Sequence, residues 1–122
     1  MIRRQPIIVL LMLLLFESLA CVNPYLKGQT DANEAYLRVH LRTIRQAIRS
    51  YTQDKRRPPK TLQDLVNDNY LAMIPNDPMT NRPDWNIVLY NCSTNADCVE
   101  GIKDVHSSSS SKSSDGRPYS QW

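Results

Sequence analysis

The sequence predicts an α+β fold in which a long N-terminal helix packs on a small antiparallel sheet. Residues 31 to 51 contain no glycine or proline and carry apolar side chains at helical spacing. Residues 84 to 90 and 99 to 105 have the composition of strands and flank a short polar loop, as in a β-hairpin. The chain has 122 residues, so about 100 remain for one domain once the apolar N-terminus is set aside.

The first 22 residues are predicted to be an apolar signal or anchor segment, followed by an exported domain over residues 23 to 122. Arg3 and Arg4 precede an uninterrupted apolar run from Ile7 to Phe16. This run has the length of a signal-peptide core and is shorter than the roughly 20 residues that span a bilayer. We therefore expect the domain to leave the cytosol.

Two processing routes fit the end of this segment. Ser18 and Ala20 are small residues at the positions that signal peptidase prefers, which favours cleavage before Cys21. A cysteine directly after such a site also makes Cys21 a candidate for lipidation, although Glu17 and the order Ser18-Leu19 differ from a usual lipobox.

A helix is predicted from Asp31 to Tyr51. Asp31 is expected to be the N-cap, with Glu34 as its capping-box partner. One apolar stripe should face the sheet, and it consists of Leu37, Leu41, Ile44, Ile48 and Tyr51.

A basic band runs beside this stripe and consists of Arg38, Arg42, Arg45 and Arg49. As an assembly face, the band would meet acidic groups of neighbouring subunits or other partners. The favoured interpretation is a solvated flank, in which the arginine stems cover the edge of the stripe and pair locally, for example Glu34 with Arg38.

The residues after the helix predict a break, a short helix and a turn. Pro58 and Pro59 cannot continue a helix, and Thr61 is placed to cap a short helix that ends near Val66. The run from Pro75 to Pro78 has the composition of a turn.

The predicted hairpin carries two cysteines. Cys92 and Cys98 flank five polar or small residues in an exported chain, so a disulfide that pins the loop is the simplest prediction. A metal site would need more ligands than two thiols and the distant His106. A Cys–His nucleophile pair would need an orienting group that the sequence does not offer.

A serine-rich run, residues 107 to 114, is predicted to be a hydrophilic loop, closed by the packing of Tyr119 and Trp122. The formal net charge of +3 is too small to indicate a nucleic-acid partner. The chain has only 3 glycines, no phosphate-binding loop and no HExxH motif, and His40 lies at the edge of the apolar stripe. We therefore predict no enzymatic activity.

Several segments occur in the order found in the major pseudopilin family of type II secretion systems, often called secretion protein G. The chain resembles this family from Asn23 to Trp122. The segments that carry the resemblance are Leu41 to Ile48, Thr61 to Val66, Ile74 to Pro78, Asp104 to Ser107, and Ser120 to Trp122.

The resemblance implies a pilin-like fold and a role in assembly. Family members stack through their N-terminal helices into a short periplasmic filament that supports protein export by the general secretion pathway. The expected partners are other pseudopilins or secretion-system subunits, together with the inner membrane of the bacterial cell envelope. The resemblance adds a third processing route, in which residues 7 to 22 stay uncleaved as a membrane anchor. The family's Gly-Phe cleavage site followed by Glu is not found here, which favours an alternative: a periplasmic lipoprotein or soluble binding module with a pseudopilin fold.

The resemblance also implies a calcium site in the serine-rich loop. Asp115, and Asp104 if it is not in the strand, would be the carboxylate ligands, and serine hydroxyls would supply neutral oxygens. The loop offers fewer carboxylates than tight calcium sites use, so a loop without cofactor, closed by Tyr119 and Trp122, is the competing expectation.

Overall fold

The computed structural model describes residues 22–94 and 96–122. The chain divides into two compact units, Met1–Ala32 and Asn33–Trp122. Residues 1–21, which hold all but the last residue of the predicted apolar segment and include the candidate lipidation site Cys21, lie outside the described residues. Within the described part of the chain, no helix combines the length and the hydropathy needed to cross a membrane.

The main element is helix α2, Val22–Lys55. The predicted start at Asp31 is wrong, because the helix already includes Asp31 and the residues before it. Pro24 stands in the first turn, where a missing N–H costs no intrahelical hydrogen bond, and a single Gly28 costs only about 1 kcal/mol. The helix ends at Lys55, where Arg56 takes a φ of 57° ahead of the two prolines.

The short helix α3, Leu62–Asn67, is capped as predicted. The Thr61 side chain accepts a hydrogen bond from the Asp64 backbone, and the Asp64 carboxylate accepts one from the Thr61 backbone. The segment after α3 is tied to the end of α2, because the Tyr70 hydroxyl donates to Asp54 at 2.7 Å and its ring packs on Tyr51.

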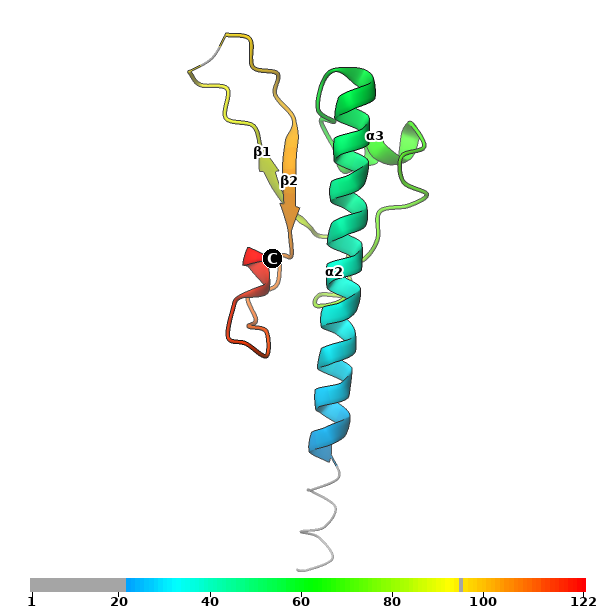
Figure 1. Ribbon diagram of the computed structural model, residues 1–122, viewed down its shortest axis with the longest axis vertical. Coiled ribbons are helices and arrows are strands. Elements are labelled where there is room, and N and C mark those ends of the chain that lie inside the picture. The colour runs from blue at the N-terminus through cyan, green and yellow to red at the C-terminus, as the bar shows by residue number, and fades with distance from the viewer. Residues whose placement is uncertain (1–21, 95) are drawn as a thin grey trace, which may run out of the picture. The chain divides into compact units, whose positions relative to one another are not determined.

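The sheet is a two-stranded antiparallel hairpin of β1, Asn86–Leu89, and β2, Ile102–His106, which confirms the α+β class. In Figure 1 the hairpin lies along one side of α2, and α3 lies near the C-terminal end of that helix. Only β2 buries side chains, Ile102 and Val105, and every residue of β1 is exposed. Gly101 precedes β2 because a Cβ there would lie 2.6 Å from the Pro58 side chain.

The core forms between the predicted apolar stripe of α2 and the chain that returns to it. All five stripe residues are buried, which confirms the orientation of the helix. Each buried aliphatic side chain contributes roughly 1.5–3 kcal/mol. The residues that pack on the stripe include Trp85, Ile102, Val105, Tyr119 and Trp122.

The serine-rich run is a loop, as predicted, but much of it is buried rather than hydrophilic surface. Ser107, Ser109 and Ser113 are buried. The Ser107 hydroxyl accepts from the backbone N–H of Ser109, and the Ser109 hydroxyl accepts from that of Ser111. The serine hydroxyls thus accept hydrogen bonds from backbone N–H groups that have no neighbouring strand to pair with. A serine-rich sequence can therefore form a partly buried loop.

Candidate functional site: an arginine cleft beside the C-terminal residues

Arg45 joins α2 to β2 and to the last residue of the chain. Its Nε donates to Asp104 Oδ1 at 2.7 Å, and its Nη2 donates to the backbone oxygens of Val105 and Trp122, each at 2.9 Å. Burial raises the pKa of Asp104, but the hydrogen bonds from Arg45 and the Val105 amide outweigh it and hold the pKa below 3.8. Arg45 therefore links α2 to β2 and to the C-terminal residue.

Arg38 and Arg117 both lie over the indole ring of Trp122. The guanidinium carbon of Arg38 is 4.4 Å from the ring centroid, and that of Arg117 is 5.3 Å away. Arg38 also pairs with Glu34 at 3.9 Å, as predicted for the flank interpretation. These cation–π contacts fix two positive charges beside the C-terminal aromatic residue.

Arg42 and Arg49 are exposed, as Arg38 is, but neither has a carboxylate partner among the described residues. Arg49 donates to the neutral Gln46 side chain at 2.7 Å. The Arg42 guanidinium forms no hydrogen bond or ion pair with any residue that the structure describes. The four arginines that the sequence groups together therefore differ, since two are bound within the domain and two carry charge without a carboxylate partner among the described residues.

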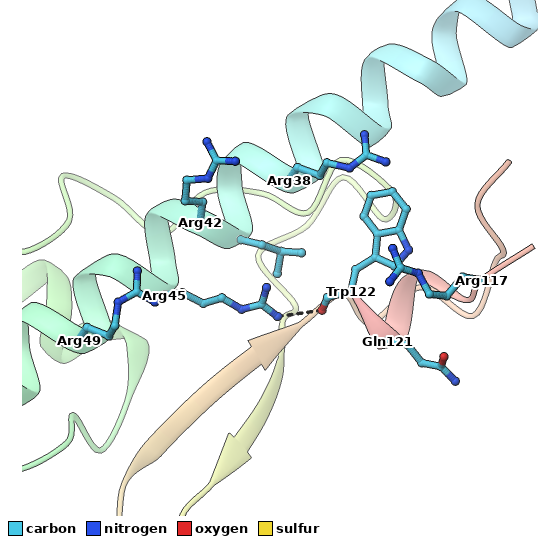
Figure 2. A pocket seen from close by; sticks show the side chains of 8 residues that line it. Arg38, Arg42, Arg45, Arg49, Arg117, Gln121 and Trp122 are labelled. Atoms are coloured by element: carbon cyan, nitrogen blue, oxygen red, sulfur yellow. Dashed lines mark hydrogen bonds between the residues drawn. The ribbon is translucent and has the colours of Figure 1, made fainter. Parts of the chain in front are cut away.

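These arginines line a cleft of about 410 Å³ between α2 and the C-terminal residues. Figure 2 shows Arg38 beside Trp122 and the bond from Arg45 to the Trp122 oxygen. The lining residues are Arg38, Leu41, Arg42, Arg45, Arg49, Arg117, Gln121 and Trp122. We call this site the arginine cleft.

The arginine cleft is rich in donors and poor in acceptors. The indole Nε1 of Trp122 is buried and has no acceptor within the described part of the chain. The guanidinium groups that line the cleft only donate hydrogen bonds. The cleft therefore suits a carboxylate or another anion, and its lining offers no nucleophile or general base for catalysis.

The wall of the cleft formed by the C-terminal residues is anchored to α2 through Glu34. This buried carboxylate accepts hydrogen bonds from the Tyr119 hydroxyl at 2.9 Å and from the Ser114 amide at 3.0 Å. The predicted capping-box role of Glu34 is wrong, because Glu34 lies inside α2 and binds residues about 80 positions later in the chain.

The cysteines of the hairpin are joined in a disulfide. Cys92 and Cys98 have Cα atoms 5.3 Å apart and close the loop that connects β1 to β2. The loop lies beyond the paired residues of the two strands.

The two candidate calcium ligands have separate partners. Asp104 binds Arg45, whereas Asp115 accepts hydrogen bonds from the Ser113 hydroxyl and the Arg117 amide, which lower its pKa. Among the described residues, no group of three or more His, Cys, Asp or Glu side chains could hold a metal ion. Calcium binding by this loop stays a prediction, and it would depend largely on serine and backbone oxygens.

Three residues that matter to this region were not singled out from the sequence for these roles. Arg117 and Trp122 form a wall of the cleft, and their pairing across the C-terminal turn has no sequence periodicity. Asp77 was placed only in a turn, yet it is fully buried and accepts from the Ser107 hydroxyl at 2.5 Å and the Met79 amide at 2.8 Å. The signal for Asp77 was its position before Pro78, which is typical of an aspartate that bonds its own turn.

Comparisons with protein-family models, with curated proteins and with solved structures find no match to this chain.

Proposed function

We propose that this protein is a pseudopilin-like structural component of a type II secretion system, the general secretion pathway, and that it assembles through its N-terminal helix. The observation that carries the proposal is that α2 has a second apolar face. Val39 lies nearly opposite the buried stripe and Tyr36 lies on the flank away from the arginines, and they keep 53% and 60% of their surface exposed. A helix with apolar residues on two sides is suited to pack on the domain with one side and on neighbouring subunits with the other.

The sequence resemblance supplies the cellular setting of this proposal. The protein would be held at the inner membrane, or released into the periplasm, of a bacterial cell. Its partners would be other pseudopilins or secretion-system subunits. The proposal requires neither catalysis nor nucleic-acid binding.

A second candidate function is a periplasmic lipoprotein or soluble binding module. The arginine cleft favours this candidate, because a concave site of about 410 Å³ lies within the range of roughly 300–1,000 Å³ that is typical of ligand sites. The intact mass of the full chain extracted from membranes separates the candidates, since an acylated mature form beginning at Cys21 would support the lipoprotein.

Cross-linking in membranes tests the assembly proposal. A photo-reactive amino acid at Val39 of the full chain should give cross-linked species with pilin-like subunits, whereas the same group at Gln63, on the exposed side of α3, should not. Val39→Asp should reduce the amount of exported protein in the culture medium, and Gln63→Asp is the matched control. Equal secretion by both variants, with no Val39 cross-links, would count against assembly through the helix.

A further inference from the structure

The arginine cleft holds more positive charge than the domain neutralises. Five arginines line it, and none of the acidic residues that the structure describes is among its lining residues. Two of the arginines, Arg38 and Arg45, pair with carboxylates of the domain. The other three form no ion pair with any described residue, and they are Arg42, Arg49 and Arg117. A concave site lined by charges of one sign concentrates ions of the opposite sign, so the cleft attracts anions.

The unpaired arginines lie on two walls of the cleft. Figure 2 shows Arg42 and Arg49 on the side of α2 and Arg117 on the side of the C-terminal residues. Arg117 lies over the Trp122 ring, with its guanidinium carbon 5.3 Å from the ring centroid. A guanidinium group that lies over a ring still has N–H groups at its edge that can donate. An anion between the walls can therefore accept hydrogen bonds from both sides.

The number of unpaired arginines favours phosphate over carboxylate as the ligand group. A carboxylate carries one negative charge on two oxygens, whereas a phosphate monoester carries a charge of about −1.5 to −2 at pH 7 and has three strong acceptor oxygens. Guanidinium groups bind phosphate through two parallel hydrogen bonds, and clusters of arginines recognise phosphate in many proteins. Three unpaired arginines on two walls thus match one phosphate group better than one carboxylate.

We propose that the arginine cleft binds a phosphate group, with Arg42 and Arg49 as donors from α2 and Arg117 as the donor from the C-terminal wall. The phosphate belongs either to a soluble compound or to a lipid headgroup that ends in phosphate, since both present the same oxygens. This inference goes beyond the proposed assembly function, because Tyr36 and Val39 are not among the residues that line the cleft.

Calorimetric titration of the full chain in micelles of a neutral detergent tests the site. Inorganic phosphate and glycerol phosphate are the soluble probes, phosphatidic acid mixed into the micelles is the lipid probe, and an oligoglutamate peptide is the carboxylate probe. We expect at least one phosphate probe to bind, and to bind more tightly than the peptide. Added sodium chloride should weaken this binding, because salt screens the attraction between exposed charges.

Substitutions on both walls locate the binding in the cleft. Arg42→Gln and Arg117→Gln should each weaken phosphate binding about tenfold, because each removes a charged donor. Arg42→Lys should weaken it less, since lysine keeps the charge and loses only the paired N–H groups. Arg56→Gln is the matched control, because Arg56 is exposed, forms no ion pair with a described residue and lies outside the cleft. It should leave the Kd unchanged.

The melting temperature of each variant verifies that it is folded, and the variant on the second wall keeps the test decisive if one variant is not. Binding of a soluble probe that both Gln variants weaken would identify a soluble phosphate compound as the ligand. Binding of phosphatidic acid alone, with the same losses, would identify a lipid headgroup.

Three results would overturn the phosphate site. They are the absence of binding by every phosphate probe, tighter binding of the oligoglutamate peptide, and a loss in Arg56→Gln as large as that in Arg42→Gln. The Val39 cross-links do not depend on these titrations, so the phosphate site and the proposed assembly function stand or fall separately.

Discussion

Glu34 links the first part of the folded unit to its last part. Its carboxylate is buried, and it accepts hydrogen bonds from Tyr119 and Ser114 while it pairs with Arg38. A buried carboxylate is tolerated only when its hydrogen bonds are satisfied, and here the C-terminal turn supplies the donors. Glu34 therefore determines where the C-terminal residues, and with them one wall of the arginine cleft, are held.

We predict that Glu34→Ala lowers the free energy of unfolding of the fragment 24–122 by roughly 2–3 kcal/mol, because it removes a charged acceptor from the buried Tyr119 hydroxyl and from the part-buried Ser114 amide. Tyr119→Phe removes one donor and should cost only about 1 kcal/mol. Urea denaturation measures both values. An Ala variant that is as stable as the parent would show that the carboxylate does not anchor the C-terminal turn.

Calcium at Asp115 is the second prediction at the scale of single residues. We expect a chelator to leave the melting temperature of the fragment unchanged, since serines offer neutral oxygens where calcium prefers charged ones. Deletion of Trp122 should lower the melting temperature with or without chelator, because its ring packs on Tyr119. A chelator-induced decrease that disappears in Asp115→Ala would instead demonstrate a calcium site, since a ligand bound only to the folded state stabilises it.

At the scale of elements, α2 divides its surface between a buried stripe and a charged flank. Ile44 is fully buried, whereas Arg42 is exposed two residues earlier. Ile44→Asp places an unpaired charge in the core and should cost several kcal/mol, a large share of the roughly 5–15 kcal/mol that stabilises a small domain.

Arg42→Asp introduces the same side chain at the exposed position and should leave the fragment folded. Circular dichroism melting curves of the two variants test this difference. Comparable unfolding of both would mean that the flank containing Arg42 is also part of the core in solution.

The hairpin depends on its disulfide because its own strands are short. β1 buries no residue fully, and an isolated two-stranded hairpin is marginal in water. We predict that alkylation of unreduced protein from the cell envelope labels neither Cys92 nor Cys98, and that reduction exposes both. Labelling of both cysteines in native protein would indicate that the loop is open.

At the scale of the whole molecule, the shifted pKa values define the pH range of highest stability. Hydrogen bonds lower the pKa of Asp115 below 3.8. Burial raises the pKa of Asp104, but its hydrogen bonds outweigh burial, so this pKa also lies below 3.8. Their contribution to stability is present above pH 3.8 and is lost as the pH falls through the lowered values.

Two tyrosines act at the alkaline end. A hydrogen bond to Asp54 raises the pKa of Tyr70 to about 12, and burial followed by the bond to Glu34 raises that of Tyr119 to about 12. Their contribution is present below pH 10 and is lost as the pH rises toward 12. We predict a plateau of the melting temperature near neutral pH and a decrease at both ends. Tyr119→Phe should lose less stability than the parent between pH 10 and 12, and an identical decrease in both proteins would contradict this origin.

The sequence by itself determined the elements whose signals are local or periodic. The apolar spacing of α2 identified its buried stripe, Thr61 identified the cap of α3, and β-branched residues on both sides of a polar loop identified the hairpin. These signals are readable because side-chain direction follows backbone geometry, with a period of 3.6 in helices and 2 in strands. The start of α2 was predicted wrongly because aspartate is a common N-cap residue. The helix in fact continues through Asp31 from Val22.

Residues that share one sequence pattern have different roles, and only the tertiary structure shows which role each of them has. Arg38, Arg42, Arg45 and Arg49 repeat regularly, but of these four only Arg45 binds the backbone oxygens of Val105 and Trp122. Glu34 meets Tyr119, and Asp77 meets Ser107, across separations of 85 and 30 residues. Such long-range polar contacts leave no periodic trace, because they depend on where the returning chain places a donor. The arginine cleft therefore forms only in the folded chain, where the arginines of α2 lie beside the C-terminal residues. The spacing of the arginines along α2 does not predict that neighbour.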